Sequence, residues 1–184
     1  MKKIVYMAAT LLLCMLTFSC SKEDIGGTAT QSMAGEWYVT VDAVDEAGNL
    51  VYSDNQLYGI GRFHILTYNT AANTPTEMIV DDLGNFWKFK VKISCDPQTL
   101  TFSANTTENN NLVAGYEDIN VPIMDGKILP KAGRQNNGSP ADSIVFYVNF
   151  SDDLQEDGTP TPQAAGFAKY RVSGVRYSGL VEND

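Results

Sequence analysis

The sequence predicts an all-β protein, an up-and-down antiparallel β-barrel of about eight strands. Apolar and polar residues alternate with a period of two along most of the chain, which is typical of strands with one buried and one solvated face. Short breaks rich in Gly, Asp, Asn and Pro separate these segments and indicate hairpin connections. No helical period extends across the turn residues. A sheet of this many strands hides its edges by closing into a barrel or by forming a two-sheet sandwich.

Residues 1–19 have the features of a signal peptide. Lys2 and Lys3 precede an almost unbroken apolar run that is too short for a comfortable membrane span. The run ends in Leu-Thr-Phe-Ser-Cys, which resembles the lipobox of bacterial lipoproteins, with Cys20 as the lipid attachment site. An ordinary secretion signal or an N-terminal anchor helix is the alternative. Three acyl chains would fix the protein to a membrane, because each buried methylene contributes about 0.8 kcal/mol.

Residues 20–33 are expected to form the lipidated cysteine and a flexible tether, because they are rich in glycine, serine and threonine. The charged run Ser-Lys-Glu-Asp after Cys20 resembles the export signal of surface lipoproteins of the Bacteroidota, although a solvated tether has the same composition. We therefore expect an outer membrane lipoprotein, on the cell surface or on the periplasmic face.

Residues 34–184 are expected to form one barrel domain, without an internal linker or repeat. Removal of residues 1–19, which carry two lysines and no acidic residue, lowers the formal net charge from −9 to −11. Nucleic acid is not an expected partner, because a phosphate backbone attracts a basic surface. Cys95 is the only cysteine left after Cys20, so no disulfide is expected, and the core must supply the stability.

The strands are expected in chain order near residues 35–44, 57–68, 76–80, 86–94, 99–104, 116–123, 127–129 with its continuation, 142–150 and 165–177. The clearest alternation is the stretch Phe-Trp-Lys-Phe-Lys-Val-Lys-Ile, in which Trp87, Phe89 and Val91 share one face and the lysines share the other. This pattern requires a strand with one dry and one wet face.

The first strand begins with Gly35-Glu36-Trp37, a glycine two residues before a tryptophan. Gly-x-Trp at the head of a meander of this length resembles the lipocalin signature. Together with the lipobox, it makes the mature chain similar to the lipocalin-like lipid-binding lipoproteins of the Bacteroidota, which have calycin-type barrels and carry a hydrolase label.

The resemblance implies a structural motif made of Gly35, Trp37 and Arg176. In lipocalins the tryptophan closes one end of the barrel, and an arginine from the last strand packs over its ring, which contributes about 0.5–2 kcal/mol. Arg171 is the other candidate, but Arg176 is favoured because Gly174 permits a bulge that redirects the end of the strand. Alternatively, Trp37 is simply a core aromatic residue and both arginines are solvated.

An eight-stranded barrel is just wide enough to be filled by side chains or to hold one small ligand. Large and small inward residues could line an apolar cup or interdigitate into a dry core, and the resemblance favours the cup. The residues expected to line it are Trp37, Phe63, Ile65, Phe89, Val91, Phe102, Phe146 and Val148.

The sequence offers little catalytic chemistry. His64 is the only histidine and is expected on the outer face, and neither a Gly-x-Ser-x-Gly motif nor partners for Cys95 are found. We therefore name no catalytic residue and do not expect an enzyme, despite the hydrolase label. One histidine and one available cysteine cannot assemble a zinc site, and the acidic loop 152–157 fits a solvated hairpin better than a calcium site. No metal and no cofactor are expected.

The predicted function is that of a membrane-anchored lipoprotein whose barrel binds a small apolar or amphipathic, lipid-like ligand. The first alternative is a non-catalytic structural or adhesion domain, a sandwich or a filled barrel, that binds a protein or glycan partner. The second is a hydrolase that acts on lipids or glycans. A void between the inward side chains would distinguish the ligand-binding barrel from the structural or adhesion domain. The sequence names no particular protein partner.

Overall fold

The computed structural model describes residues 26–180 and residue 183, so the predicted signal peptide and Cys20 lie outside the described residues. The strands are β1 (Gly35–Val44), β2 (Leu50–Tyr52), β3 (Phe63–Asn69), β4 (Glu77–Asp81), β5 (Lys90–Asp96), β6 (Thr101–Ala104), β7 (Ile123–Arg134), β8 (Pro140–Val148) and β9 (Lys169–Arg176). Two short helices, α2 (Asp54–Leu57) and α3 (Thr161–Ala165), follow β2 and β8.

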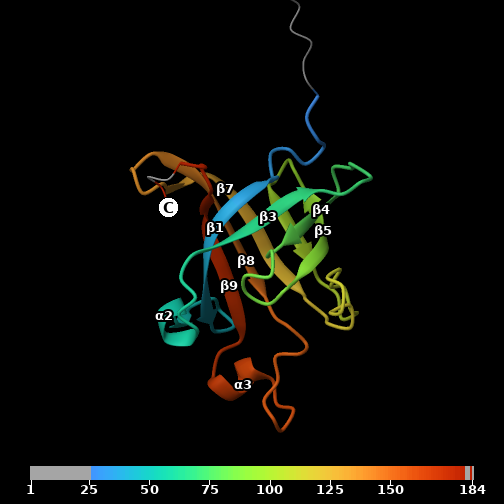
Figure 1. The fold of residues 1–184 in the computed structure, drawn as a ribbon, viewed down its shortest axis with the longest axis vertical. Coiled ribbons are helices and arrows are strands. Elements are labelled where there is room, and N and C mark those ends of the chain that lie inside the picture. Colours follow the sequence, from blue (N-terminus) through green and yellow to red (C-terminus); the bar gives the residue numbers. More distant parts are fainter. Residues whose placement is uncertain (1–25, 181–182, 184) are drawn as a thin grey trace, which may run out of the picture.

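The strands form a closed antiparallel barrel, as the sequence predicts. Each strand from β3 to β8 pairs with the next strand in the chain, β1 pairs with β3, and β1 also pairs with β9. The barrel therefore has eight strands, and β2 adds a short pairing at the end of β1. Figure 1 shows the barrel with α2 and α3 below it.

The alternation of apolar and polar residues explains which side chains of the barrel wall face inward and which face outward. In β1, Trp37, Val39 and Val41 are fully buried, whereas the residues between them keep some exposed surface. In β5, Val91 and Ile93 are buried between the outward-facing lysines. Inward side chains from all eight barrel strands join one hydrophobic core, which excludes water from the interior.

Five of the predicted strand ranges need correction. Residues 127–129 lie inside β7, which begins at Ile123, and the last strand begins at Lys169 instead of residue 165. Leu57 ends α2, and residues 58–62 turn after it, because Gly59 and Gly61 adopt left-handed φ angles of 64° and 76°. Residues 86–89 belong to the connection between β4 and β5, and most of 116–123 is irregular. Strand β2 and the two helices were not predicted, because segments of three to five residues carry too little periodicity.

The predicted tether is too long at its C-terminal end. Residues 29–33 form turns on the barrel, and the backbone N–H groups of Met33 and Ala34 donate to the Thr30 carbonyl group. Thr30 and Met33 are fully buried, and Met33 belongs to the core. The segment is mostly polar in sequence, but its one large buried apolar residue, Met33, packs in the core. The folded part therefore begins before residue 34.

The two ends of the barrel differ in what covers them. We call the end next to residues 28–34 the floor and the end next to α2 and α3 the rim, which lie at the top and the bottom of Figure 1.

No helix in the described part of the chain is long and apolar enough to cross a membrane.

Candidate functional site

The floor is built around Trp37, which has no exposed surface. Trp37 and Arg176 are direct cross-strand partners on β1 and β9, and the Arg176 guanidinium carbon lies 4.3 Å from the centre of the indole ring. The indole N–H donates to Thr67 Oγ1 at 2.8 Å, and the Thr67 hydroxyl group donates to the Met33 carbonyl group at 2.7 Å. The indole ring therefore links β1, β3, β9 and the chain before β1.

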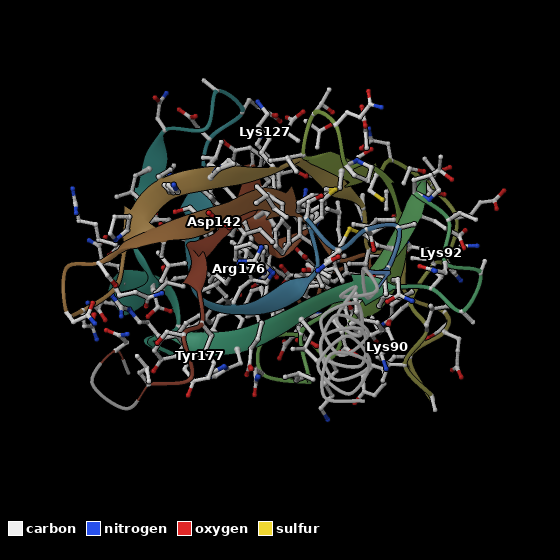
Figure 2. All side chains as sticks on the ribbon, turned by 90° about the horizontal axis from the view of Figure 1, so that it is seen from above. Lys90, Lys92, Lys127, Asp142, Arg176 and Tyr177 are labelled. Atoms are coloured by element: carbon white, nitrogen blue, oxygen red, sulfur yellow. The ribbon has the colours of Figure 1, made fainter. Side chains whose placement is uncertain are left out.

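Arg176 is held by two further contacts. Its Nη1 donates to the Ala34 carbonyl group at 2.6 Å, and its Nε lies 3.3 Å from Asp142 Oδ2. Figure 2 looks onto the floor and shows Arg176 beside Asp142 near the middle of the barrel, with Lys90 and Lys92 at its periphery. A Cβ on Gly35 would collide with the guanidinium group, so a larger residue here would require Arg176 to move from its place over Trp37.

The reason given for preferring Arg176 over Arg171 needs correction. The pairing of β1 with β9 is uninterrupted from Lys169 to Arg176, so Gly174 makes no bulge. A Cβ on Gly174 would instead collide with the Tyr38 backbone, so glycine allows the two strands to approach closely. Arg171 points to the outer face, where it pairs with Asp42 at 2.8 Å.

The residues predicted to line a cup are brought together in the barrel core. Those with no exposed surface are Trp37, Ile65, Val91, Phe146 and Val148, whereas Phe89, Phe102 and Phe63 are 1%, 4% and 6% exposed. A side chain with no exposed surface has no water-sized space beside it. The interior is therefore packed by its own side chains around these residues, and a ligand there would have to displace them.

A cluster of aromatic side chains covers the rim. We call it the rim cluster, and its members are Tyr58, Phe86, Trp87, Phe150, Phe167 and Tyr170. Trp87 stacks on Phe150, with ring centres 4.9 Å apart, and Phe150 continues the cluster inward to Phe89 at 5.7 Å. The members come from the start of β9 and from the connections that lead into β3, β5 and β9. Only the closed barrel brings these segments together.

A small polar network lies within the rim cluster. The buried Tyr170 hydroxyl group donates to Asp153 Oδ2 at 2.6 Å and lies 2.8 Å from the Tyr58 hydroxyl group. Burial, followed by the hydrogen bond to Asp153, raises the pKa of Tyr170, so the phenol stays neutral. The network thereby satisfies polar groups that the aromatic rings remove from water.

Asp82 fixes the connection that carries Phe86 and Trp87. Its side chain has no exposed surface, and its two carboxylate oxygens accept hydrogen bonds from five backbone N–H groups, those of residues 84 and 86–89, at 2.8–3.1 Å. Backbone donors to a buried carboxylate make strong hydrogen bonds. The connection is therefore held in one shape, with its aromatic residues in the rim cluster.

An open pocket of about 570 Å³ borders the rim cluster on the side of α3. Phe150 and Phe167 form part of its wall, together with Pro160 and Pro162. Its volume lies within the range of about 300–1,000 Å³ that small-molecule sites occupy.

The predicted ligand site contains no member of the rim cluster. All six residues fall within predicted strand ranges, and Trp87 and Phe150 were expected on inward faces of the barrel wall. The available signal was that aromatic residues stand next to turn-forming residues, as in Gly84-Asn85-Phe86-Trp87 and Gly166-Phe167. Such residues gather at the barrel ends, but the sequence does not show which connections meet.

The other chemically active side chains lie apart from the rim cluster. His64 Nδ1 lies 2.8 Å from Glu36 Oε1 on the outer face. The Cys95 thiol contacts the Pro75 carbonyl group at 3.5 Å, and burial raises its pKa, which disfavours the reactive thiolate. Among residues 26–180 and 183, no group of three or more potential metal ligands occurs.

The fold and the rim define a small closed antiparallel barrel with an apolar interior and an aromatic rim. The chain belongs to the family described as "lipid-binding putative hydrolase", whose sequence model matches residues 22–181. A comparison with curated proteins found no match.

Proposed function

We propose that the protein is a lipid-anchored outer membrane lipoprotein of the lipocalin-like type whose barrel binds a small amphipathic, lipid-like molecule at the rim. Membership of a lipid-binding family and the apolar barrel support a hydrophobic ligand. The observation that carries the choice of site is the rim cluster, because it gathers six aromatic side chains beside an open pocket.

The proposed site differs from the cup that the sequence predicted. The inward side chains leave no water-sized space next to Trp37 or Val91, so an acyl chain cannot enter without moving them. At the rim, aromatic rings contact one another and Tyr58 is 44% exposed. An acyl chain that packs on these rings buries apolar surface, and each Å² removed from water stabilises the complex by about 25 cal/mol.

The protein contains two tryptophans, one at each end of the barrel, which allows a test of the site. A chain that begins at Ser21 retains every contact of the described residues and has no acylation site. A terminally brominated dodecanol should quench its tryptophan fluorescence, because bromine quenches on contact and Trp87 lies in the rim cluster. We expect the Trp87→Phe variant, whose remaining tryptophan is Trp37, to lose this quenching.

Unbrominated dodecanol is the matched control, since it should compete for the site without quenching. Quenching that persists in Trp87→Phe would place the ligand at the floor and contradict the rim site. The absence of quenching and of competition in the parent chain would contradict lipid binding itself.

A second candidate function is a non-catalytic domain that binds a protein or a glycan partner. The packed interior favours it, because a barrel filled by its own side chains needs no ligand. The same titration separates the two candidates, because a filled adhesion domain should leave the fluorescence of both tryptophans unchanged.

The proposed anchor leads to a separate prediction. When the full chain is expressed in a bacterium that is fed an alkyne-tagged palmitate, we expect the wild-type protein to take up the label and Cys20→Ala to remain unlabelled. Membrane fractionation should show the tagged wild-type protein with the outer membrane. Cys14→Ala is the control, because Cys14 lies within the predicted signal peptide. Equal labelling of Cys20→Ala would show that Cys20 is not the acylated residue.

A further inference from the structure

A second open pocket lies on the outer side of the connection between β4 and β5, at the rim. It has a volume of about 540 Å³ and is lined by Asp81, Leu83, Gly84, Lys88, Lys90, Leu112, Val113 and Ala114. The pocket is lined by two chain segments, residues 81–90 and 112–114, and Asn111 joins them. Its side chain accepts from the backbone N–H groups of Lys90 and Val113 and donates to the Lys88 carbonyl group. The pocket is thus a fixed part of the rim.

Two leucines in this pocket contribute little to folding. Leu83 and Leu112 are 50% and 54% exposed, so half of each side chain gains nothing from burial. Leu83 also has a φ of 56°, a left-handed conformation that is unfavourable for a non-glycine residue. The Asp82 hydrogen bonds hold the connection in this shape. The structure therefore maintains an apolar surface in contact with water.

The positive charge of the pocket belongs to Lys88. Lys90 pairs with Asp81 at 3.0 Å, and the hydrogen bond that Lys90 donates to Asp81 raises the pKa of Lys90, so these two charges offset each other. The ion pairs of residues 26–180 and 183 do not include Lys88, whose Nζ donates to the Tyr116 hydroxyl group at 3.2 Å. An ammonium group has three donors, so two are left for a ligand.

From this arrangement we infer that the pocket binds the carboxylate head group of a single-chain amphiphile, that is, a fatty acid. Lys88 supplies the cation, and an unused N–H donor of its ammonium group hydrogen-bonds to a carboxylate oxygen. Leu83 and Leu112 pack against the first methylene groups. The rest of the acyl chain reaches the rim cluster beside Trp87, the residue before Lys88.

The inference rests on the proposed function, because it names the head group of the amphiphile that the rim holds. The formal net charge of −11 for the chain without residues 1–19 does not oppose it. Charges more than about 8–10 Å away are largely screened at physiological salt, whereas the pocket itself is lined by two lysines and one aspartate, and the neighbouring Asp82 carboxylate is buried.

Titration calorimetry of the chain that begins at Ser21 tests the inference with dodecanoate and dodecyl maltoside, which carry the same chain on an anionic and a neutral head group. We expect dodecanoate to bind more tightly, and Lys88→Gln to weaken its binding roughly two- to fivefold without affecting dodecyl maltoside. Lys88→Arg should retain the preference. Added salt should weaken only the binding of dodecanoate.

Lys131→Gln is the matched control, because Lys131 is also exposed and has the same φ of 54° as Lys88. General damage to the fold lowers both affinities and leaves their ratio unchanged. Equal affinities for the two amphiphiles, an unchanged ratio in Lys88→Gln, or loss of the preference in Lys88→Arg would each overturn the head-group inference and leave the proposed function intact. If neither amphiphile binds the parent chain, the proposed function fails as well.

Discussion

Replacement of Trp37 by Ala is expected to lower the free energy of unfolding by about 3–5 kcal/mol, the range for a large aromatic residue removed from a core. Trp37 has no exposed surface, so truncation leaves a cavity at the floor. The change also removes the hydrogen bond to Thr67 and the cation–π contact with Arg176. Urea-induced unfolding of the chain that begins at Ser21, followed by circular dichroism, measures the loss.

Tyr38→Ala is the control, because Tyr38 is the next residue on β1 and faces outward. Its ring contacts His64 and Tyr177 on the outer surface, so its truncation should cost about 1 kcal/mol or less. Similar losses in the two variants would mean that the inward and outward faces of β1 do not differ in the way that the structure shows.

Replacement of Asp82 by Asn is expected to lower the free energy of unfolding by about 2–4 kcal/mol, although the two side chains have nearly the same size. The amide keeps one acceptor oxygen and turns an N–H₂ group toward backbone donors that lose their acceptor. Each buried donor without an acceptor costs about 1–3 kcal/mol. Amide hydrogen exchange should also become faster at residues 84 and 86–89, since these residues donate to the Asp82 carboxylate.

Asp157→Asn is the matched control for this substitution. Asp157 is exposed, and its side chain accepts from the backbone N–H group of one residue, Thr159. Its replacement should change the free energy of unfolding by less than about 0.5 kcal/mol. An Asp82→Asn variant with wild-type stability and wild-type exchange would show that the five hydrogen bonds do not hold the connection.

The Asp82 hydrogen bonds also connect the two proposals. The connection that they fix places Phe86 and Trp87 in the rim cluster and Leu83 and Lys88 in the outer pocket. If ligand binding uses both sides of this connection, Asp82→Asn should weaken the binding of dodecanoate as well as the fold.

The sequence by itself determined the all-β fold class, and the resemblance carried by Gly35 and Trp37 favoured a closed barrel over a two-sheet sandwich. Alternation with a period of two is a local property, because neighbouring side chains of a strand point to opposite faces whatever the partner strand is. This is why the inward faces of β1, β5 and β8 could be predicted from single stretches. The family match over residues 22–181 agrees with the lipid-binding part of the resemblance that the sequence suggested.

Only the tertiary structure decided how full the barrel is and where a ligand could bind. The sequence gives the size of each inward residue, but the space between Phe89, Phe102 and Phe146 depends on strand tilt and on which residues share a level. The rim cluster has the same origin, since Tyr58, Trp87 and Phe150 are distant in the chain and meet only when the barrel closes. Local patterns fix the direction of each side chain, whereas packing and site geometry depend on contacts between distant segments.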